Sequence, residues 1–343
     1  MNNATINDRK REHLDLAGLP AMQMTNDNGL SEVKFEPCAI PELNFNEVDT
    51  GSSLFGKSLR QPLIIASMSG GTRSARRLNE TLAAAAEQAG VALGLGSMRI
   101  AIEQPDQRAS FQLRSVAPTI PILANIGGAQ LAQPEGVDHA IRCIDIAQAD
   151  GLFVHLNPLQ EVLQANGDRQ WRGVLKAIET LIVKAPVPVI IKEVGHGIGP
   201  KTAKTLLDVG VRYLDIAGTG GTSWAAIETE RNRAGNNPQM GEVFHNFGIN
   251  LHDSLKRMGT QLNIDDSLTL IASGGIRSGL DVAKTIRLGA SFASAAAPML
   301  TAAQQGESAL IEVLTQWQQQ LQICCFITGS ASLTELRHAA LIE

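Results

Sequence analysis

Eight short apolar runs, rich in isoleucine, valine, leucine and alanine, recur along the chain from residue 62 onward. A continuous apolar run without alternation is typical of a parallel strand that is covered on both faces. The sequence therefore predicts eight buried parallel strands. The runs are PLIIASM (62–68), VALGLG (91–96), PILANIG (121–127), GLFVHLN (151–157), PVIIKEV (188–194), YLDIAG (213–218), TLIASGG (269–275) and SFASAAA (291–297).

The segments between these runs have the periodicity of amphipathic helices. Examples are SARRLNETLAAAAEQAG (74–90), PEGVDHAIRCIDIAQA (134–149) and GLDVAKTIRLGA (279–290). Eight strand–helix units over about 260 residues match the usual size of a (β/α)8 barrel, an α/β fold. A doubly wound open sheet is the alternative. We expect the barrel to occupy residues 61–343, after an irregular N-terminal extension over residues 1–60.

Polar residues at the ends of the predicted strands favour the closed barrel. A barrel places its active site at the carboxyl-terminal ends of its strands, where these side chains would meet. The polar segment 228–239 reads as a mobile loop or lid over this face. The strand-end residues are Ser67, Ser69, Ser97, Arg99, Asn125, His155, Asn157, Lys192, Glu193, Asp215 and Thr222.

Composition excludes several classes of protein. The chain of 343 residues is 44% hydrophobic and 18% charged, which is typical of a globular protein, and its net charge of −5 offers no basic field for nucleic acid. The four cysteines lack metal-ligand spacing, which favours a reducing cytoplasm. The polar N-terminus and the absence of a long apolar stretch predict neither export nor a membrane span.

Two glycine-rich turns follow predicted strands. SGGIRSGLDVAK (273–284) runs from a strand end into a helix, and GTGGTSWAAIE (218–228) adds Thr222 and Ser223 as hydroxyl donors. Backbone N–H groups of such turns bind phosphate, and barrels often use the loops after strands seven and eight for this purpose. A tight turn that needs a positive φ, or a hinge, is the alternative for each.

Lys192 and the stretch HLNPLQE (155–161) carry the remaining chemistry. Lys192 ends an apolar run, so its ammonium would meet an anion, a reduced flavin or a carbonyl substrate in a partly desolvated place. We expect Gln160 and Glu161 to begin the loop that follows the strand, where Glu161 would supply the single carboxylate that is typical of a magnesium site. A polar turn with a core histidine is the alternative for HLNPLQE, and the basic cluster RKREH (9–13) by itself reads as a solvated helix face.

Over nearly its whole length, the chain resembles the type 2 isopentenyl-diphosphate isomerases. The motifs that carry this resemblance are, in order, RKREH, SMSGG, GSMR, ANIG, HLNPLQE, IKEVG, AGTGGTSWAAIE and SGGIRSGLDVAK. These flavin enzymes interconvert isopentenyl and dimethylallyl diphosphate in isoprenoid biosynthesis. HLNPLQE and GGTSWAAIE are the specific pieces, whereas SGGIR is shared by many FMN barrels. The resemblance implies that the protein binds FMN and Mg²⁺ and that NADPH or NADH reduces the flavin. It also implies a homo-oligomer, either a tetramer or an octamer, in the cytoplasm.

The resemblance also implies roles for individual residues. His155, Gln160 and Lys192 would be catalytic, and Glu161 would bind the metal. The substrate would contact Arg9, Lys10, Ser97, Met98, Arg99, His155, Asn157 and Gln160. FMN would contact Ser67, Met68, Ser69, Gly70, Ser97, Asn125, Lys192, Thr222, Gly274, Gly275, Ala295 and Ala296.

The chain departs from the family pattern at two positions, where Gly199 and Ala217 stand in place of common hydroxyl residues; we expect both losses to remove contacts near the cofactor. Trp224 is a candidate wall of the prenyl pocket, although a structural tryptophan is equally compatible with the sequence. Two other functions compete. An FMN-dependent hydroxy-acid oxidase would use His196 as its base, and a non-catalytic phosphate-binding barrel would need neither Lys192 nor Glu161.

Overall fold

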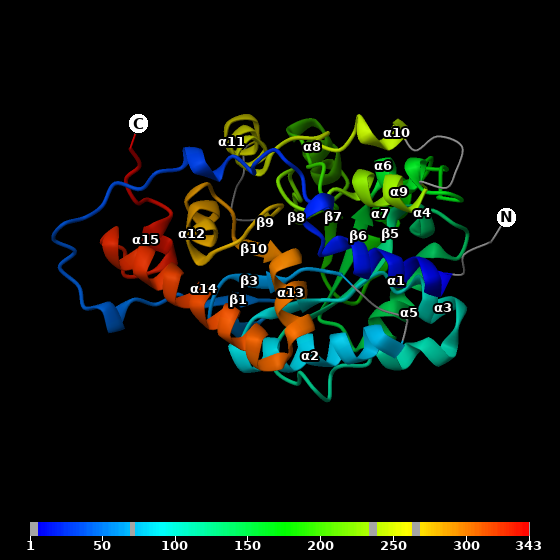
Figure 1. Cartoon of the computed structure of the whole chain (residues 1–343), viewed down its shortest axis with the longest axis horizontal. Helices are drawn as coiled ribbons and strands as arrows, with labels where there is room; N and C mark the ends of the chain where they lie inside the picture. The colour runs from blue at the N-terminus through cyan, green and yellow to red at the C-terminus, as the bar shows by residue number, and fades with distance from the viewer. Residues whose placement is uncertain (1–5, 69–72, 233–238, 263–267, 343) are drawn as a thin grey trace.

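A computed structural model of the chain shows a closed barrel of parallel strands surrounded by helices (Figure 1). The structure describes residues 6–68, 73–232, 239–262 and 268–342, and of residues 6–11, 73–74 and 239 it describes the backbone alone. The barrel strands are β3 (Leu63–Ile65), β4 (Ala92–Gly94), β5 (Ile122–Gly127), β6 (Gly151–Leu156), β7 (Val189–Glu193), β8 (Tyr213–Asp215), β9 (Thr269–Ser273) and β10 (Phe292–Ala295).

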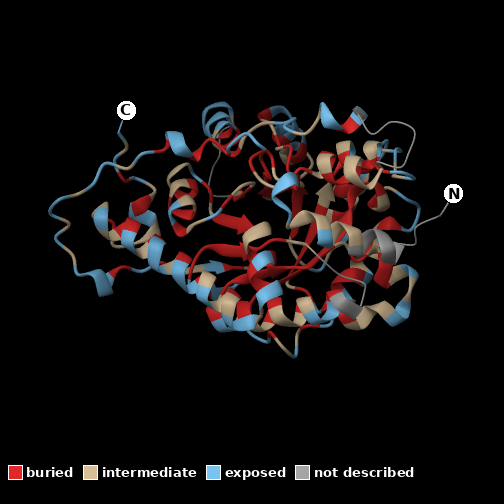
Figure 2. Ribbon diagram, viewed as in Figure 1, coloured by how far each residue is buried: buried red, intermediate tan, exposed pale blue. Residues whose placement is uncertain are grey.

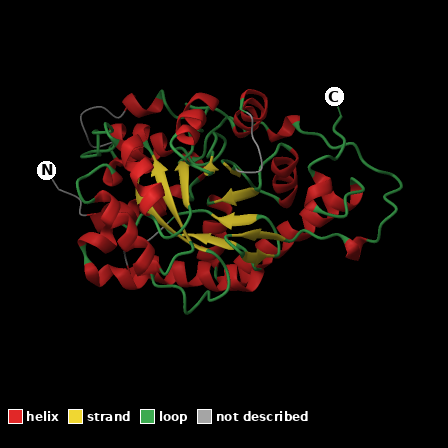
Figure 3. Ribbon diagram, turned by 180° about the vertical axis from the view of Figure 1, so that it is seen from behind, coloured by secondary structure: helices red, strands yellow, loops and turns green. Residues whose placement is uncertain are grey.

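The strands pair in chain order, and β10 closes the barrel on β3. Each of the eight apolar runs forms one of these strands, so the predicted (β/α)8 fold is confirmed and the open sheet is excluded. The strand sequences are apolar without alternation because the strands are covered on both faces: every residue of β3, β4, β5 and β7 is buried. Seen from behind, the strands form the centre of the molecule with helices outside them (Figure 3).

Helices follow the strands along the chain. Their apolar faces pack on the barrel and their polar faces are exposed (Figure 2). The helices are α2 (Arg73–Ala89), α3 (Arg99–Glu103), α4 (Gly128–Leu131), α5 (Gly136–Ala147), α6 (Pro158–Leu163), α7 (Val174–Lys184), α8 (Pro200–Asp208), α9 (Trp224–Arg231), α10 (Gln239–Glu242), α11 (Leu251–Gln261), α12 (Gly279–Arg287), α13 (Ala297–Gln305), α14 (Glu307–Ile327) and α15 (Leu333–Leu336), with a 3-10 helix η4 (Pro105–Phe111).

The N-terminal extension is more regular than predicted. It contains helix α1 (Ile6–Ala17), the 3-10 helices η1 (Pro20–Met22), η2 (Leu30–Glu32) and η3 (Phe45–Glu47), and an antiparallel hairpin of β1 (Ser52–Leu54) and β2 (Lys57–Leu59). Short elements of this kind carry a weak sequence signal because they are stabilised by packing on the barrel. The division into an extension of 1–60 and a barrel of 61–343 stays a prediction.

The predicted lid is also corrected in part. Residues of the 228–239 segment up to Arg231 belong to α9, and α10 begins at Gln239. Ser223 caps α9 by accepting a hydrogen bond from the N–H of Ala226, which explains where the helix begins. Residues 233–238 lie outside the described part. Within the described residues, no helix is long and apolar enough to span a bilayer.

Candidate active site

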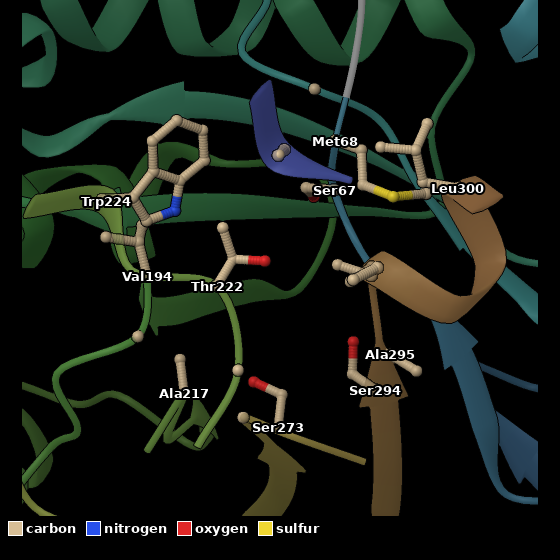
Figure 4. Close-up of a pocket in the computed structure, with 18 of the residues that line it drawn as sticks. Ser67, Met68, Val194, Ala217, Thr222, Trp224, Ser273, Ser294, Ala295 and Leu300 are labelled. Atoms are coloured by element: carbon tan, nitrogen blue, oxygen red, sulfur yellow. The ribbon is translucent and has the colours of Figure 1, made fainter. Parts of the chain in front are cut away.

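A cavity of about 740 Å³ lies at the carboxyl-terminal ends of the barrel strands. This volume is within the range of sites that enclose a cofactor or substrate. Residues at or just beyond the end of every barrel strand line it, and α1, α13 and α14 add further walls. Figure 4 shows Trp224 and Val194 on one side of the cavity and Ser294, Ala295 and Leu300 on the other.

Most of the predicted site residues meet in this one cavity. Met98 is the exception, because its side chain is fully buried in the hydrophobic core. Arg9 and Lys10 lie on α1 with side chains outside the described part, and Ser69 and Gly70 lie outside the described residues altogether. The predicted residues that line the cavity are Ser67, Met68, Ser97, Arg99, Asn125, His155, Asn157, Gln160, Glu161, Lys192, Thr222, Gly274, Gly275, Ala295 and Ala296.

A cluster that we call the floor, made of Lys192, Asp215 and Ser273, contains a buried ion pair, and Lys192 and Ser273 of this cluster line the cavity. Lys192 and Asp215 are register partners on the neighbouring strands β7 and β8, so their side chains emerge together. The ammonium Nζ of Lys192 lies 2.9 Å from Oδ2 of Asp215 and 3.4 Å from Oγ of Ser273, which donates a short hydrogen bond to Asp215. The pairing balances one charge with the other in a site where Asp215 is fully buried.

One wall of the cavity comes from β6 and the first turn of α6. Asn157 precedes Pro158, which starts α6, so Gln160 and Glu161 lie on this helix and not in the predicted loop. The ring nitrogen Nδ1 of His155 lies 2.7 Å from Oδ1 of Asn125 on β5. The amide of Asn157 donates to Gln160 (2.9 Å) and to Glu161 (3.2 Å). Asn157, Gln160 and Glu161 therefore form a connected network, and His155 pairs separately with Asn125; all of these residues line the cavity.

Glu161 is nearly buried and is held by three donors. Its carboxylate accepts hydrogen bonds from Asn157, from the side chain of Gln164 (3.3 Å) and from the backbone N–H of Asp168 (2.7 Å). No group of three histidine, cysteine, aspartate or glutamate side chains within the described part is arranged to hold a metal by itself. A cation at Glu161 would therefore need further oxygen ligands from a substrate or from water.

Arg99 begins α3 and reaches the same wall. Its Nε donates to Glu103 (2.7 Å) and its NH1 group donates to Asp168 (3.0 Å). Burial would lower the pKa of Arg99, but the hydrogen bond and charge of Glu103 and the charge of Asp168 outweigh burial and raise that pKa. Arg99 is thus a permanent cation beside Glu161.

A cluster that we call the rim, made of His13, Trp224, Glu228 and Arg231, joins α1 to α9, and His13 and Trp224 of this cluster line the cavity. Glu228 is fully buried, and its carboxylate lies 2.8 Å from Nε2 of His13 and 2.6 Å from NH1 of Arg231. The ring of His13 packs edge-on against Trp224 at 5.1 Å. Burial would raise the pKa of Glu228, but the hydrogen bond and charge of His13 and the charge of Arg231 outweigh burial and hold that pKa below its ordinary range.

Gln160 connects this rim to the wall, because its side-chain amide donates to Glu228 over 3.2 Å. The N-terminal extension therefore helps to orient a residue of HLNPLQE. The sequence contained His13 within a basic cluster and Glu228 within a predicted loop, and it gave neither a role. Contacts over 215 residues of chain separation have no local signal.

The glycine turn after β9 packs against the turn after β8. Gly274 (φ +109°) and Gly275 (φ +70°) have left-handed backbones, and the place of a Cβ at Gly274 is occupied by the carbonyl oxygen of Gly218. Both turns line the cavity beside Ala296, the residue that caps the N-terminus of α13. The positive φ alternative is thus correct for this turn, and phosphate binding by its backbone N–H groups stays a prediction.

Ser223, Gly199 and His196 are not among the described residues that line the cavity. Ser223 caps α9 and donates its hydroxyl to the carbonyl of His245. Gly199 begins α8, and the expected loss of a cofactor contact there stays a prediction. Ala217, by contrast, lines the cavity with a strained φ of +45°.

Comparison with known proteins agrees with this geometry. A protein 44% identical, matched over 100% of this chain and 99% of its own length, is the isopentenyl-diphosphate delta-isomerase of Stutzerimonas stutzeri (strain A1501). The enzyme of the same name from Rickettsia prowazekii (strain Madrid E) is 41% identical over 98% of this chain and 97% of its own. The profile of the family described as FMN-dependent dehydrogenase matches residues 145–343. The chain belongs to the type 2 isopentenyl-diphosphate delta-isomerase family.

Solved structures similar to this chain show how widely the family's fold is shared. A mandelate oxidase with (S)-2-phenylpropionate has a TM-score of 0.63 at 17% identity, with 99% of each chain covered. A mutant mandelate oxidase with a monooxide FMN adduct has a TM-score of 0.62 at 18% identity over 96% of this chain and 92% of its own. At this identity the likeness concerns the fold alone, so membership of the isomerase family comes from the sequence relatives.

Proposed function

We propose that this protein interconverts isopentenyl and dimethylallyl diphosphate, with FMN bound in the cavity and Mg²⁺ bound with the substrate. One observation carries the proposal: a single cavity joins the HLNPLQE side chains to the buried Lys192–Asp215 pair and to the glycine turns. The sequence relatives, which are isomerases by name, support the same reaction.

Several features of the cavity fit FMN. The hydroxyl oxygens of Ser67 and Ser294 are buried at the lining without a hydrogen-bond partner in the described part, so a ligand with polar edges would satisfy them. The turn at Gly274 and Gly275 and the N-terminus of α13 would hold the phosphate through backbone N–H groups. Lys192 would lie beside the ring, with Met68, Asn125 and Thr222 as further contacts. Ser69 and Gly70 stay predictions.

The diphosphate of the substrate would lie against the wall formed by α3 and α6. Arg99, Asn157 and Gln160 are the described polar groups there, and Arg9 and Lys10 of α1 are proposed to join them. The carboxylates of Glu103, Asp168 and Glu161 surround Arg99, so the described groups near this wall carry a net negative charge. A divalent cation at Glu161 would strengthen the binding of an anionic diphosphate there, which is why we propose Mg²⁺ at this residue.

Migration of the allylic double bond adds a proton at C4 and removes one at C2. When bound, a reduced flavin supplies an acid–base group in a rigid ring and NAD(P)H supplies the electrons that reduce it. His155 and Gln160 would bind and orient the substrate, and Lys192 would balance negative charge at the floor. Trp224 and the apolar residues of α1 and α13 would exclude water from the developing tertiary carbocation.

The hydroxy-acid oxidase alternative has less support. Such an enzyme needs a histidine base in the cavity beside the flavin, and His196 does not line the cavity. Instead, the ring of His196 lies against Glu193, whose carboxylate accepts the backbone N–H groups of Val194, Gly195 and His196. Glu193 thus shapes the loop after β7, and neither side chain is among the described residues that line the cavity.

Anaerobic incubation with isopentenyl diphosphate, FMN, NADPH and Mg²⁺ tests the proposal. We expect dimethylallyl diphosphate to accumulate toward equilibrium while NADPH is consumed only to reduce the flavin once. Steady NADPH oxidation matched to product would contradict the proposal and favour a dehydrogenase. A homo-oligomer and a cytoplasmic location remain part of the proposal, to be tested by light scattering and by cell fractionation.

A further inference from the structure

We infer that Asp168 is a positioning residue for the anion end of the cavity, acting through Arg99 and Glu161. This inference rests on the proposed function, because it concerns how the same site would hold a diphosphate. Asp168 lies in the loop between α6 and α7, does not line the cavity, and has no role in the sequence-based expectations.

The contacts of Asp168 connect the two groups on which diphosphate binding would depend. Its carboxylate oxygen Oδ2 accepts a hydrogen bond from NH1 of Arg99 at 3.0 Å. Its backbone N–H donates to Oε2 of Glu161 at 2.7 Å. Asp168 therefore fixes Arg99, the proposed phosphate-binding cation, with its side chain, and Glu161, the proposed metal ligand, with its main chain.

Asp168 is itself held in place by the barrel. The side-chain amide of Gln130, at the start of the helix after β5, donates to the same Oδ2 oxygen over 2.6 Å. Gly127 at the end of β5 makes room for this arrangement, because Oε1 of Gln130 occupies the place where a Cβ would lie. The indole N–H of Trp171 holds the carbonyl of Asp168 at 2.9 Å. These contacts tie Arg99 to a rigid strand end, which reduces the entropy cost of ordering it on a ligand.

Glu103 also contacts the guanidinium of Arg99 and serves as a comparison for Asp168. It accepts from Nε of Arg99 at 2.7 Å, and its exposed fraction of 39% is close to the 35% of Asp168. However, Glu103 is four residues from Arg99 on one helix, where exposed ion pairs of this spacing contribute little to stability. Within the described part of the chain, the carboxylate of Glu103 contacts Arg99 and makes no hydrogen bond or ion pair to the barrel or to Glu161, so it would follow Arg99 and not direct it.

A positioning role predicts that loss of Asp168 weakens anion binding, whereas a purely electrostatic role predicts that it strengthens anion binding. A carboxylate that only repels the diphosphate, or competes for Arg99, would weaken anion binding, so its removal would strengthen binding. Asparagine distinguishes the two roles. Because Arg99 and Gln130 both donate to one oxygen, an asparagine amide oxygen in that position can accept both hydrogen bonds without the charge.

The test measures binding of inorganic pyrophosphate to the flavin-loaded, oxidised protein by calorimetry, with and without Mg²⁺, so that it does not depend on turnover. We expect Asp168→Ala to weaken pyrophosphate binding about tenfold, as is typical when a supporting contact of a binding group is lost. Asp168→Asn and the matched control Glu103→Gln should each stay within about threefold of the parent. FMN affinity should be unchanged in all three.

A double-mutant cycle with Arg99→Ala shows whether the effect passes through Arg99. In that background Asp168→Ala should have little further effect without Mg²⁺. Stronger pyrophosphate binding in both Asp168 variants, or equal losses in Asp168→Ala and Glu103→Gln, would overturn the inference. If the parent protein binds pyrophosphate in this Asp168-dependent way but forms no dimethylallyl diphosphate, the proposed reaction fails while the positioning role stands.

Discussion

The floor and the rim of the cavity are both built around a buried carboxylate, but they are assembled differently. On the floor, Lys192 and Asp215 are register partners on adjacent strands, so the sheet itself sets their separation. On the rim, His13 reaches Glu228 across 215 residues of sequence, and Arg231 links Glu228 to Glu12 of α1. The floor therefore forms when the barrel forms, whereas the rim forms only when α1 docks on α9.

The two ways of assembly suit two different tasks. A group that must keep its place beside a cofactor is held by the most rigid part of the fold, and a group that meets the substrate is held where the extension docks.

Lys192→Ala removes the ion pair of the floor. It leaves Asp215 as an unpaired buried charge, so we expect unfolding free energy to fall by about 3–5 kcal/mol, together with a great loss of flavin binding or isomerase activity. Denaturant titration and flavin release measure these effects. Lys204→Ala is the matched control, because Lys204 pairs with Asp208 on an exposed helix face and its loss should be nearly neutral. A Lys192→Ala protein with parental stability and activity would show that the pair does not hold the floor.

Glu161→Gln separates the metal from the other wall contacts. The change keeps the shape of the side chain but removes the charge that favours a hard cation, so the Mg²⁺ concentration for half-maximal activity should rise by at least about tenfold. His155→Ala and Gln160→Ala should instead raise KM or lower kcat/KM with little change in that concentration. Titration of Mg²⁺ at saturating substrate compares the three variants. An unchanged Mg²⁺ requirement in Glu161→Gln would leave HLNPLQE as a polar turn that closes a strand.

Glu228→Gln weakens the rim and changes how stability depends on pH. The pKa of Glu228 is lowered from an ordinary value of 4.5, so its ionised form stabilises the folded protein above that value, and this stability is lost as pH falls through the folded pKa. We expect the variant to be less stable at pH 7 by about 1–3 kcal/mol, and the difference to shrink below pH 4.5. Thermal unfolding at several pH values measures this, with Glu80→Gln on the exposed face of α2 as the control. A difference that stays constant down to acid pH contradicts an ionised Glu228.

Ala217→Gly should have the smallest effect. Ala217 has a left-handed backbone (φ +45°), which costs a residue with a Cβ about 1–2 kcal/mol, and glycine removes this strain at the expense of chain entropy. We expect stability to rise by about 1 kcal/mol or less. Ala203→Gly, in the regular helix α8, should lower stability by a similar amount. Equal losses in the two variants would show that the backbone at residue 217 is unstrained.

Much of the site was predictable because parallel strands obey simple rules. Each apolar run becomes one strand, and the carboxyl ends of all strands meet at one face, so strand-end residues such as His155 and Lys192 had to come together once the barrel closed. The resemblance to known isomerases then assigned them roles. The same reasoning misplaced Gln160 and Glu161 in a loop, because proline at the first position of a helix gives the same signal as proline in a turn.

The barrel, the family and most of the strand-end residues that line the cavity followed from the sequence, because periodicity and strand-end chemistry are local properties of the chain. The tertiary structure was needed to show that Glu228 is a buried partner of His13, that Asp168 connects Arg99 to Glu161, and that His196 is absent from the cavity lining. These outcomes depend on how loops and the N-terminal helix pack on the closed barrel. Such contacts join residues far apart in sequence, and no local pattern records them.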